Sequence, residues 1–219
     1  MRAFKRAFAL FVLWISGWKV KGAAPTAPRY VIIAAPHTSG WDLVYTLATA
    51  WSNDIDIKWI GKHTLFFFPY GWFFRFLGGI PMDRRSRQNM VTKATERFKA
   101  QDSLVLLVSA EATRKRTDVW KSGFYHIAYQ SGVPIQLAGI HYDRRECTFG
   151  PLVTPTGRVS EDMDIVREFY RDVADGGRFK DQFGEIKLRD ETPVGPSSVP
   201  RPAHDTSDDE DLTTATSTG

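Results

Sequence analysis

Residues 30–51 read YVIIAAPHTSGWDLVYTLATAW, and they indicate the fold class. Its first six residues are apolar and largely β-branched, which is typical of a strand buried in a sheet. Pro36 ends the run, and Thr38 or Ser39 can cap the helix that we predict at residues 43–51. A buried strand that leads directly into a helix is the repeating unit of α/β proteins.

The rest of the chain repeats this alternation. We predict further strands at 55–60, 80–82, 104–108, 134–142 and 147–153, an aromatic-rich helix or helix-turn at 66–77, and helices at 87–101, 119–131 and 161–174. Apolar strands that alternate with amphipathic helices favour an α/β fold with a mainly parallel central sheet flanked by helices. We assign this domain to residues 23–190.

Length and composition exclude several classes of protein. A chain of 219 residues with 42% hydrophobic residues suits one domain with a buried core. Its single cysteine, Cys147, cannot form an intrachain disulfide, and it lies in a predicted strand, where we expect a core residue. No apolar run reaches the ~18 residues of a membrane span, so a multi-span membrane protein is excluded.

The net charge of +4 is unevenly distributed. Residues 192–219 carry −4, so residues 1–191 carry +8. A basic body favours an anionic partner: nucleic acid, a membrane surface or a phosphorylated substrate. We expect no nucleic-acid partner, because no binding motif is present and the bases do not form one stripe. Pro, Ser, Thr and Asp dominate residues 191–219, which predicts a disordered acidic tail.

Residues 1–22 carry five positive charges around an apolar block at 7–18. A twelve-residue helix is ~18 Å long, well short of the ~30 Å hydrocarbon core. We therefore predict an amphipathic helix that lies in the membrane interface, with Trp14 and Trp18 at headgroup level. The alternative is a helix that packs on the domain. Both predictions can be true if one face of the helix packs on the domain and the other face contacts the membrane.

Residues 66–76 contain eight aromatic side chains. That number exceeds what one stripe of a helix can bury against a core. The segment is either a thick core layer or a surface that dips into a bilayer or lines an acyl-chain channel, with Lys62 and Arg75 near the headgroups.

His37 and Asp42 are the first candidate catalytic pair. His37 follows a buried strand, and the positive end of the next helix favours its neutral, basic form. Asp42 lies in the first turn of that helix, from which it can orient the imidazole through Nδ1. Taken alone, the same spacing also fits a histidine in a turn and a capping carboxylate.

Two further clusters follow strands. Arg84 is one of three arginines within residues 84–87, and Glu111, Thr113 and Arg114 follow the strand at 104–108. Arginine matches phosphate oxygens in a bidentate manner. These clusters are either solvated basic faces or, with His37, parts of one crevice at the carboxyl ends of the strands. His63, His126 and His141 have no metal-ligand spacing, so we predict no metal site.

The sequence resembles the glycerolipid acyltransferases of the lysophosphatidic acid acyltransferase type. Four blocks match in order within residues 29–153: HTSGWD (37–42), GGIPMDR (78–84), residues 111–114 and GVPI (132–135). Residues 66–74 (FFFPYGWFF) and 120–128 (WKSGFYHIA) also look like short bacterial members.

This resemblance implies transfer of a fatty acyl group from acyl-CoA or acyl-carrier protein to a hydroxyl of a lysophosphatidate-like acceptor. It implies a role in phospholipid biosynthesis, with no cofactor, as a peripheral or monotopic protein at the cytoplasmic face of the cell membrane. His37 would be the general base and Asp42 its partner. The acceptor's phosphate and glycerol would be held by the remaining block residues Arg84, Glu111, Thr113 and Arg114.

One block departs from the family pattern. The third block usually reads Pro-Glu-Gly-Thr-Arg, whereas alanines stand here at positions 110 and 112. The loop must then adopt ordinary backbone angles, or Ala112 must bear strain. Two alternatives therefore remain beside the lysophosphatidate acyltransferase: an acyltransferase for another lipid acceptor, and a non-catalytic membrane-binding relative.

Overall fold

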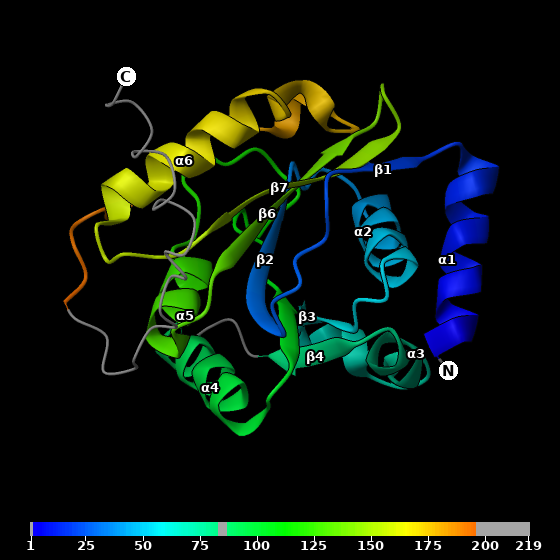
Figure 1. The fold of residues 1–219 in the computed structure, drawn as a ribbon, viewed down its shortest axis with the longest axis horizontal. Helices are drawn as coiled ribbons and strands as arrows, with labels where there is room; N and C mark the ends of the chain where they lie inside the picture. The colour runs from blue at the N-terminus through cyan, green and yellow to red at the C-terminus, as the bar shows by residue number, and fades with distance from the viewer. Residues whose placement is uncertain (1, 83–86, 196–219) are drawn as a thin grey trace, which may run out of the picture.

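The computed structural model describes residues 2–82 and 87–195, which form a sheet flanked by helices (Figure 1). The strands are β1 (Lys19–Lys21), β2 (Arg29–Ala35), β3 (Ile57–Lys62), β4 (Gly79–Met82), β5 (Leu104–Leu107), β6 (Ile135–His141) and β7 (Glu146–Val153). Their order is β1-β7-β6-β2-β5-β3-β4, and only the β6/β7 pair is antiparallel. The predicted α/β fold with a mainly parallel sheet is confirmed.

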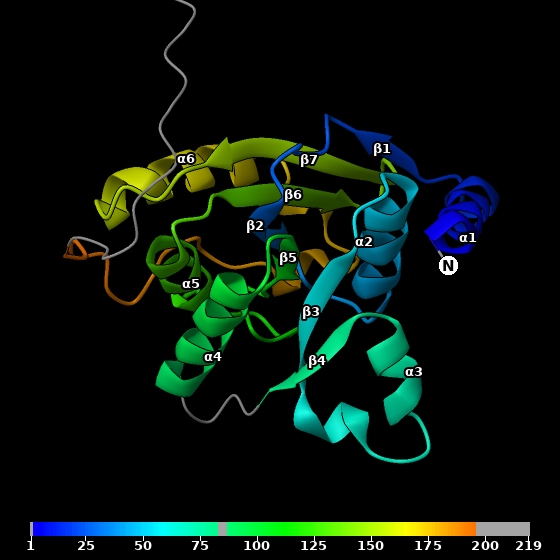
Figure 2. The ribbon, with the colours of Figure 1, turned by 60° about the horizontal axis from the view of Figure 1, so that its bottom comes forward.

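Six α-helices occur in the described part of the chain: α1 (Arg2–Ser16), α2 (Trp41–Ser52), α3 (Gly71–Phe76), α4 (Arg87–Ala100), α5 (Gly123–Ser131) and α6 (Val159–Arg171). Short 3-10 turns occupy His63–Phe66, Ala174–Gly176 and Lys180–Gln182. Helices α4, α5 and α6 lie on one side of the sheet and α2 on the other, with α1 outside α2 (Figures 1 and 2).

The central strand β2 shows why both faces are covered. Val31 and Ile33 belong to the core formed with α4, α5 and α6, whereas Tyr30 and Ile32 belong to the core formed with α1 and α2. Successive side chains of a strand point to opposite faces, so a continuously apolar strand needs helices on both sides. The YVIIAA run therefore predicts a central strand, which β2 is.

Strand β2 also places the loops that matter for function. It runs parallel to both of its neighbours, β5 and β6. The loops that follow these three strands therefore open at the same edge of the sheet. They carry His37, Ser109 and Tyr142, which are far apart in the sequence.

Helix α1 packs on the domain through Ala9 and Leu13, while Phe4, Phe11 and Trp14 are exposed on its outer side. No described helix is long and apolar enough to cross a bilayer. The helix ends at Ser16, before the expected residue 22, because Gly17 takes a left-handed conformation (φ 69°) and β1 then joins the sheet.

Trp18 corrects one detail of the expected membrane helix. Its side chain is only 7% exposed and stacks on Tyr45, with 3.8 Å between ring centroids. The expectation that Trp18 lies at headgroup level is therefore wrong. Trp14 is 77% exposed and remains available for such a contact.

The aromatic segment is not one helix and is not mainly a core layer. Only Phe66 and Phe74 pack inward, where they contact each other and Trp59. The exposed members are Phe67, Phe68, Tyr70, Trp72, Phe73 and Phe76. Gly71 begins α3 so close to the preceding turn that a Cβ atom there would lie 2.0 Å from the Phe66 carbonyl oxygen, so the chain turns sharply between the two helical pieces.

Two other boundaries differ from the sequence expectation. Residues 119–122 are not helical, because the Trp120 amide donates to the Lys187 carbonyl and the segment pairs with the chain near Leu188. The predicted tail begins too early, because the Tyr129 hydroxyl donates to the Gly195 carbonyl and Val194 packs against the core. The remainder of that predicted tail, residues 196–219, lies outside the described residues.

Candidate active site

His37 and Asp42 are paired at the end of β2. The imidazole Nδ1 lies 3.1 Å from Asp42 Oδ2, and the same oxygen accepts the backbone N–H groups of Thr38 (2.8 Å) and Ser39 (2.7 Å). Asp42 is in the first turn of α2, so its carboxylate folds back over the loop that carries His37. Since Nδ1 is engaged, Nε2 is the nitrogen left to exchange a proton with a substrate.

The second oxygen of Asp42 has a partner that the sequence did not reveal. The Tyr142 hydroxyl donates to Asp42 Oδ1 at 2.6 Å. Tyr142 directly follows β6, which neighbours β2, so its place at a strand end was the one signal that could have found it. Burial, followed by the hydrogen bond to Asp42, raises the pKa of Tyr142 well above its ordinary value, which keeps the hydroxyl a donor.

His37 and Asp42 line a cavity of about 370 Å³. The His37 side chain is 31% exposed, whereas the Asp42 side chain is 6% exposed. The apolar lining includes Trp59, Ile60, Leu65, Phe74, Leu107 and Ile140, and the polar lining includes Lys62, Ser109 and Arg114. The cavity thus combines a basic nitrogen, an apolar wall and cationic groups.

The third block supplied three described candidates, Glu111, Thr113 and Arg114. Of these, only Arg114 lines this cavity. Its guanidinium is near the start of α2, since a Cβ atom placed on Gly40 would lie 3.5 Å from it. Thr113 is not part of the lining, and its hydroxyl accepts the Lys115 amide at 3.1 Å. The expected contact of Thr113 with substrate is therefore not supported by its position.

Glu111 is buried behind the cavity. Its Oε2 accepts the backbone N–H of His37 at 2.9 Å, while Oε1 has no hydrogen-bond partner among the described residues. Burial raises the pKa of Glu111 to about 8, opposed by the His37 hydrogen bond and reinforced by the Asp42 charge. Glu111 therefore holds the backbone of His37. Its carboxyl does not line the cavity, although the resemblance implied that it would contact the acceptor.

Arg84, the remaining predicted site residue, lies outside the described residues. The strand before it, β4, is paired with β3 at the side of the sheet where Lys62 borders the cavity.

Ala112 carries the strain that the altered third block allows. Its φ is 56°, in the left-handed region that glycine adopts without penalty. The Ala112 amide donates to the Ser109 hydroxyl at 3.1 Å, which helps to hold the loop in this shape. The loop has thus kept the conformation that suits a glycine, although alanine occupies the position.

The segment after α6 closes over the His37 loop, which the sequence did not predict. The Phe179 amide donates to the Thr38 hydroxyl at 3.4 Å. The Gln182 side-chain amide, oriented with its nitrogen toward them, donates to the carbonyl oxygens of Thr38 (3.3 Å) and Arg114. This segment therefore ties together the loops that carry His37 and Arg114.

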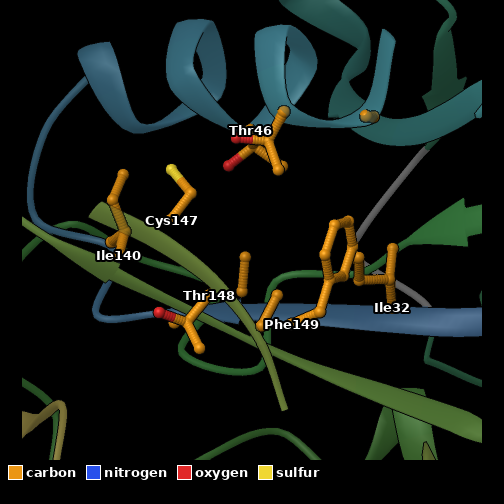
Figure 3. A pocket seen from close by; sticks show the side chains of 11 residues that line it. Ile32, Thr46, Ile140, Cys147, Thr148 and Phe149 are labelled. Carbon is orange, nitrogen blue, oxygen red and sulfur yellow. The ribbon is translucent and has the colours of Figure 1, made fainter. Parts of the chain in front are cut away.

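Cys147 lies in a separate, very small cavity between the sheet and α2 (Figure 3). The cavity measures about 20 Å³, roughly the space of one water molecule. Burial raises the pKa of the Cys147 thiol to about 12, so the reactive thiolate is disfavoured. The prediction that Cys147 is a buried core residue is confirmed.

Comparisons with known proteins test the resemblance to acyltransferases that the four sequence blocks indicated. No curated protein matches the chain. The structure is similar to that of the 1-acyl-sn-glycerophosphate (LPA) acyltransferase PlsC from Thermotoga maritima, with a TM-score of 0.56 and 16% identity over 81% of each chain. At that identity the likeness shows a shared fold. The model of the acyltransferase family matches residues 18–140, more than half of the sequence. The chain therefore belongs to the acyltransferase family.

Proposed function

We propose that this protein transfers a fatty acyl group from acyl-CoA or acyl-carrier protein to a hydroxyl of a lysophosphatidate-like acceptor. The observation that carries the proposal is the His37–Asp42 pair, 3.1 Å apart, at the wall of a cavity that is apolar on one side and bears Arg114. Family membership supports the reaction type, and the structurally similar PlsC is named for an acceptor of this class.

The chemistry needs only groups that the site holds. His37 Nε2 removes the proton from the acceptor hydroxyl as its oxygen attacks the thioester carbonyl. The C–S bond of the resulting tetrahedral intermediate then breaks, and the thiol leaves with the proton from the imidazolium. Asp42 holds the ring in the required tautomer and stabilises its positive charge. The products are an ester and a free thiol.

The cavity suggests how the two substrates divide it. The wall formed by Trp59, Leu65 and Phe74 suits a hydrocarbon chain, because burying each methylene group contributes about 0.8 kcal/mol. Arg114 suits the acceptor's phosphate through charge-assisted hydrogen bonds. We keep Arg84 as a second phosphate-binding candidate from the sequence comparison.

We further propose that the protein docks on a membrane, at its cytoplasmic face, through a surface that we call the aromatic face. It consists of the exposed large apolar side chains of α1 (Phe4, Phe8, Leu10, Phe11, Trp14 and Ile15) and of residues 67–76 (Phe67, Phe68, Tyr70, Trp72, Phe73 and Phe76). The two parts adjoin, since Lys5 of α1 lies 5.3 Å from the Phe76 ring centroid. Such an apolar patch flanked by bases suits an anionic bilayer.

A transfer assay tests the proposed reaction. Labelled acyl-CoA and acyl-carrier protein would be offered with lysophosphatidate, an uncharged monoacylglycerol and other lysolipids. We expect His37→Ala to lower the rate by about 10² to 10⁴-fold. We expect His63→Ala, which removes a histidine outside the cavity lining, to leave the rate unchanged.

Arg114→Ala should raise KM for lysophosphatidate by about tenfold or more, the effect of a lost charge-assisted contact, and should spare the monoacylglycerol. Full activity of His37→Ala would refute the mechanism. An inert wild type that still binds anionic vesicles would favour the non-catalytic alternative.

Vesicle sedimentation tests the aromatic face. Trp14→Glu and Phe68→Glu should each weaken binding to vesicles that contain anionic lipid, because both side chains are largely exposed. Ile165→Glu is the matched control, since Ile165 is exposed on α6, across the sheet from α1. Equal loss in all three variants would contradict docking through this face.

A further inference from the structure

Asp42 uses its two oxygens differently. Oδ2 pairs with the His37 imidazole and accepts hydrogen bonds from two backbone N–H groups. Oδ1 accepts a hydrogen bond from the Tyr142 hydroxyl at 2.6 Å. A carboxylate held at one oxygen can still turn about its Cβ–Cγ bond. The Tyr142 contact fixes the second oxygen, and so fixes the plane in which Oδ2 meets the imidazole.

Tyr142 is itself held on two sides. Its ring meets Trp18 edge-on, with 5.0 Å between centroids, and Tyr45 edge-on at 6.0 Å. Trp18 stacks on Tyr45 and is buried. Aromatic pairs at these separations favour a defined geometry. The Tyr142 amide also donates to the Gly176 carbonyl at 2.7 Å, which ties its backbone to the segment after α6.

The structure therefore holds the tyrosine hydroxyl more firmly than a surface contact would. Its ring position depends on Trp18, at the junction of α1 and β1, on Tyr45 of α2, and on the end of β6. These elements are distant in sequence and meet only in the folded protein. Outer partners that orient catalytic side chains in this way typically change activity by tenfold or more when removed.

We propose that Tyr142 is a positioning residue of the acyl-transfer reaction, which sets the orientation of Asp42 and, through it, the tautomer and direction of the His37 ring. The proposal rests on the proposed function of the His37–Asp42 pair. Tyr142 does not act on the substrate itself. Its role is separable from ring packing, because the hydroxyl can be removed while the ring stays.

Tyr142→Phe and Tyr45→Phe form a matched pair. Each variant removes one hydroxyl from the same aromatic cluster, and of these two described hydroxyls only that of Tyr142 donates to the Asp42 carboxylate. We expect Tyr142→Phe to lower kcat about tenfold with KM within about twofold of wild type. Tyr45→Phe should keep both constants, and the two variants should have similar melting temperatures.

A spectroscopic readout separates positioning from a general loss of structure. The proton between His37 Nδ1 and Asp42 Oδ2 should give a downfield NMR resonance that is absent in His37→Ala. It should shift in Tyr142→Phe and stay in place in Tyr45→Phe. An unchanged resonance together with an unchanged kcat in Tyr142→Phe would overturn the inference. If His37→Ala itself keeps full activity, the proposed function fails instead, so the two failures are distinguishable.

Discussion

Asp42 and Asp162 occupy similar positions in the fold, but only Asp42 borders a cavity of substrate size. Each lies in the first turn of a helix and is about 95% buried. Each accepts a backbone N–H from the preceding loop and a tyrosine hydroxyl, from Tyr142 at Asp42 and from Tyr125 at Asp162. Both carboxylates therefore join a helix start to a loop and to a distant tyrosine.

The difference lies in the remaining side-chain partner. At Asp42 it is the His37 imidazole, which lines the cavity, whereas at Asp162 it is the Thr156 hydroxyl, 3.0 Å away. An imidazole can take up a proton near neutral pH, and a threonine hydroxyl cannot. One arrangement of hydrogen bonds thus stabilises structure at one site and is available for chemistry at the other.

Matched substitutions by asparagine should separate these two uses most strongly. We expect Asp42→Asn to lower kcat by about 10³ to 10⁴-fold, because asparagine cannot hold the histidine in the tautomer that accepts a proton at Nε2. Steady-state acyl transfer would measure this loss. A decrease below tenfold, with the fold intact by circular dichroism, would contradict the role of Asp42.

Asp162→Asn should do the reverse. Since it replaces a buried, charge-assisted acceptor of three hydrogen bonds, we expect it to lower the free energy of unfolding by about 2–3 kcal/mol. Urea denaturation would measure the change, and kcat of the folded enzyme should stay within twofold of wild type. A large loss of kcat would show that the two aspartates are not functionally distinct.

Glu111 extends the comparison to a third buried carboxyl. It accepts one described hydrogen bond, fewer than Asp42 or Asp162 accepts. Its pKa is about 8 in the folded protein, against an ordinary value of 4.5. Between these values the folded state holds a proton that the unfolded state releases, so stability falls as the pH rises from about 4.5 to 8. Glu111→Gln, which resembles the protonated form, should remove this contribution.

Urea denaturation of both proteins at several pH values would test this prediction. The stability difference between wild type and Glu111→Gln should change by at most ~1.4 kcal/mol per pH unit, the limit for one proton. Parallel pH profiles would show that Glu111 titrates normally.

The smallest expected effect concerns the backbone beside each site. Gly157, which follows the Asp162 partner Thr156, has a φ of 92°, whereas Ala112, which follows the His37 partner Glu111, has a φ of 56°. Ala112→Gly should raise the free energy of unfolding by about 0.5–1 kcal/mol, because it relieves left-handed strain at some cost in backbone entropy. Thermal unfolding would measure it.

Gly157→Ala is the reverse control and should destabilise, since its Cβ would also approach the Tyr129 hydroxyl to 2.9 Å. If Ala112→Gly destabilised the protein, the alanine would be making contacts that outweigh its strain.

Much of the fold was accessible from sequence, for local reasons. The run at 30–35 is apolar at every position, which identified a strand covered on both faces, and the alternation with helices identified the parallel sheet. The boundaries of α1 and α5 were missed because distant partners decide them. β7 pairs with residues 19–21, and the chain near Lys187 pairs with Trp120.

The sequence pointed to the His37–Asp42 pair, because a carboxylate in the first turn of a helix can reach back to the loop before it, as Asp42 does. It also showed that phosphate-binding residue types such as Arg114 follow a strand. The contact between Tyr142 and Asp42, one hundred residues apart, and the contact between Glu111 and the His37 backbone appear in the folded protein alone. Sheet order and packing fix such contacts, and neither is encoded in the spacing of nearby residues.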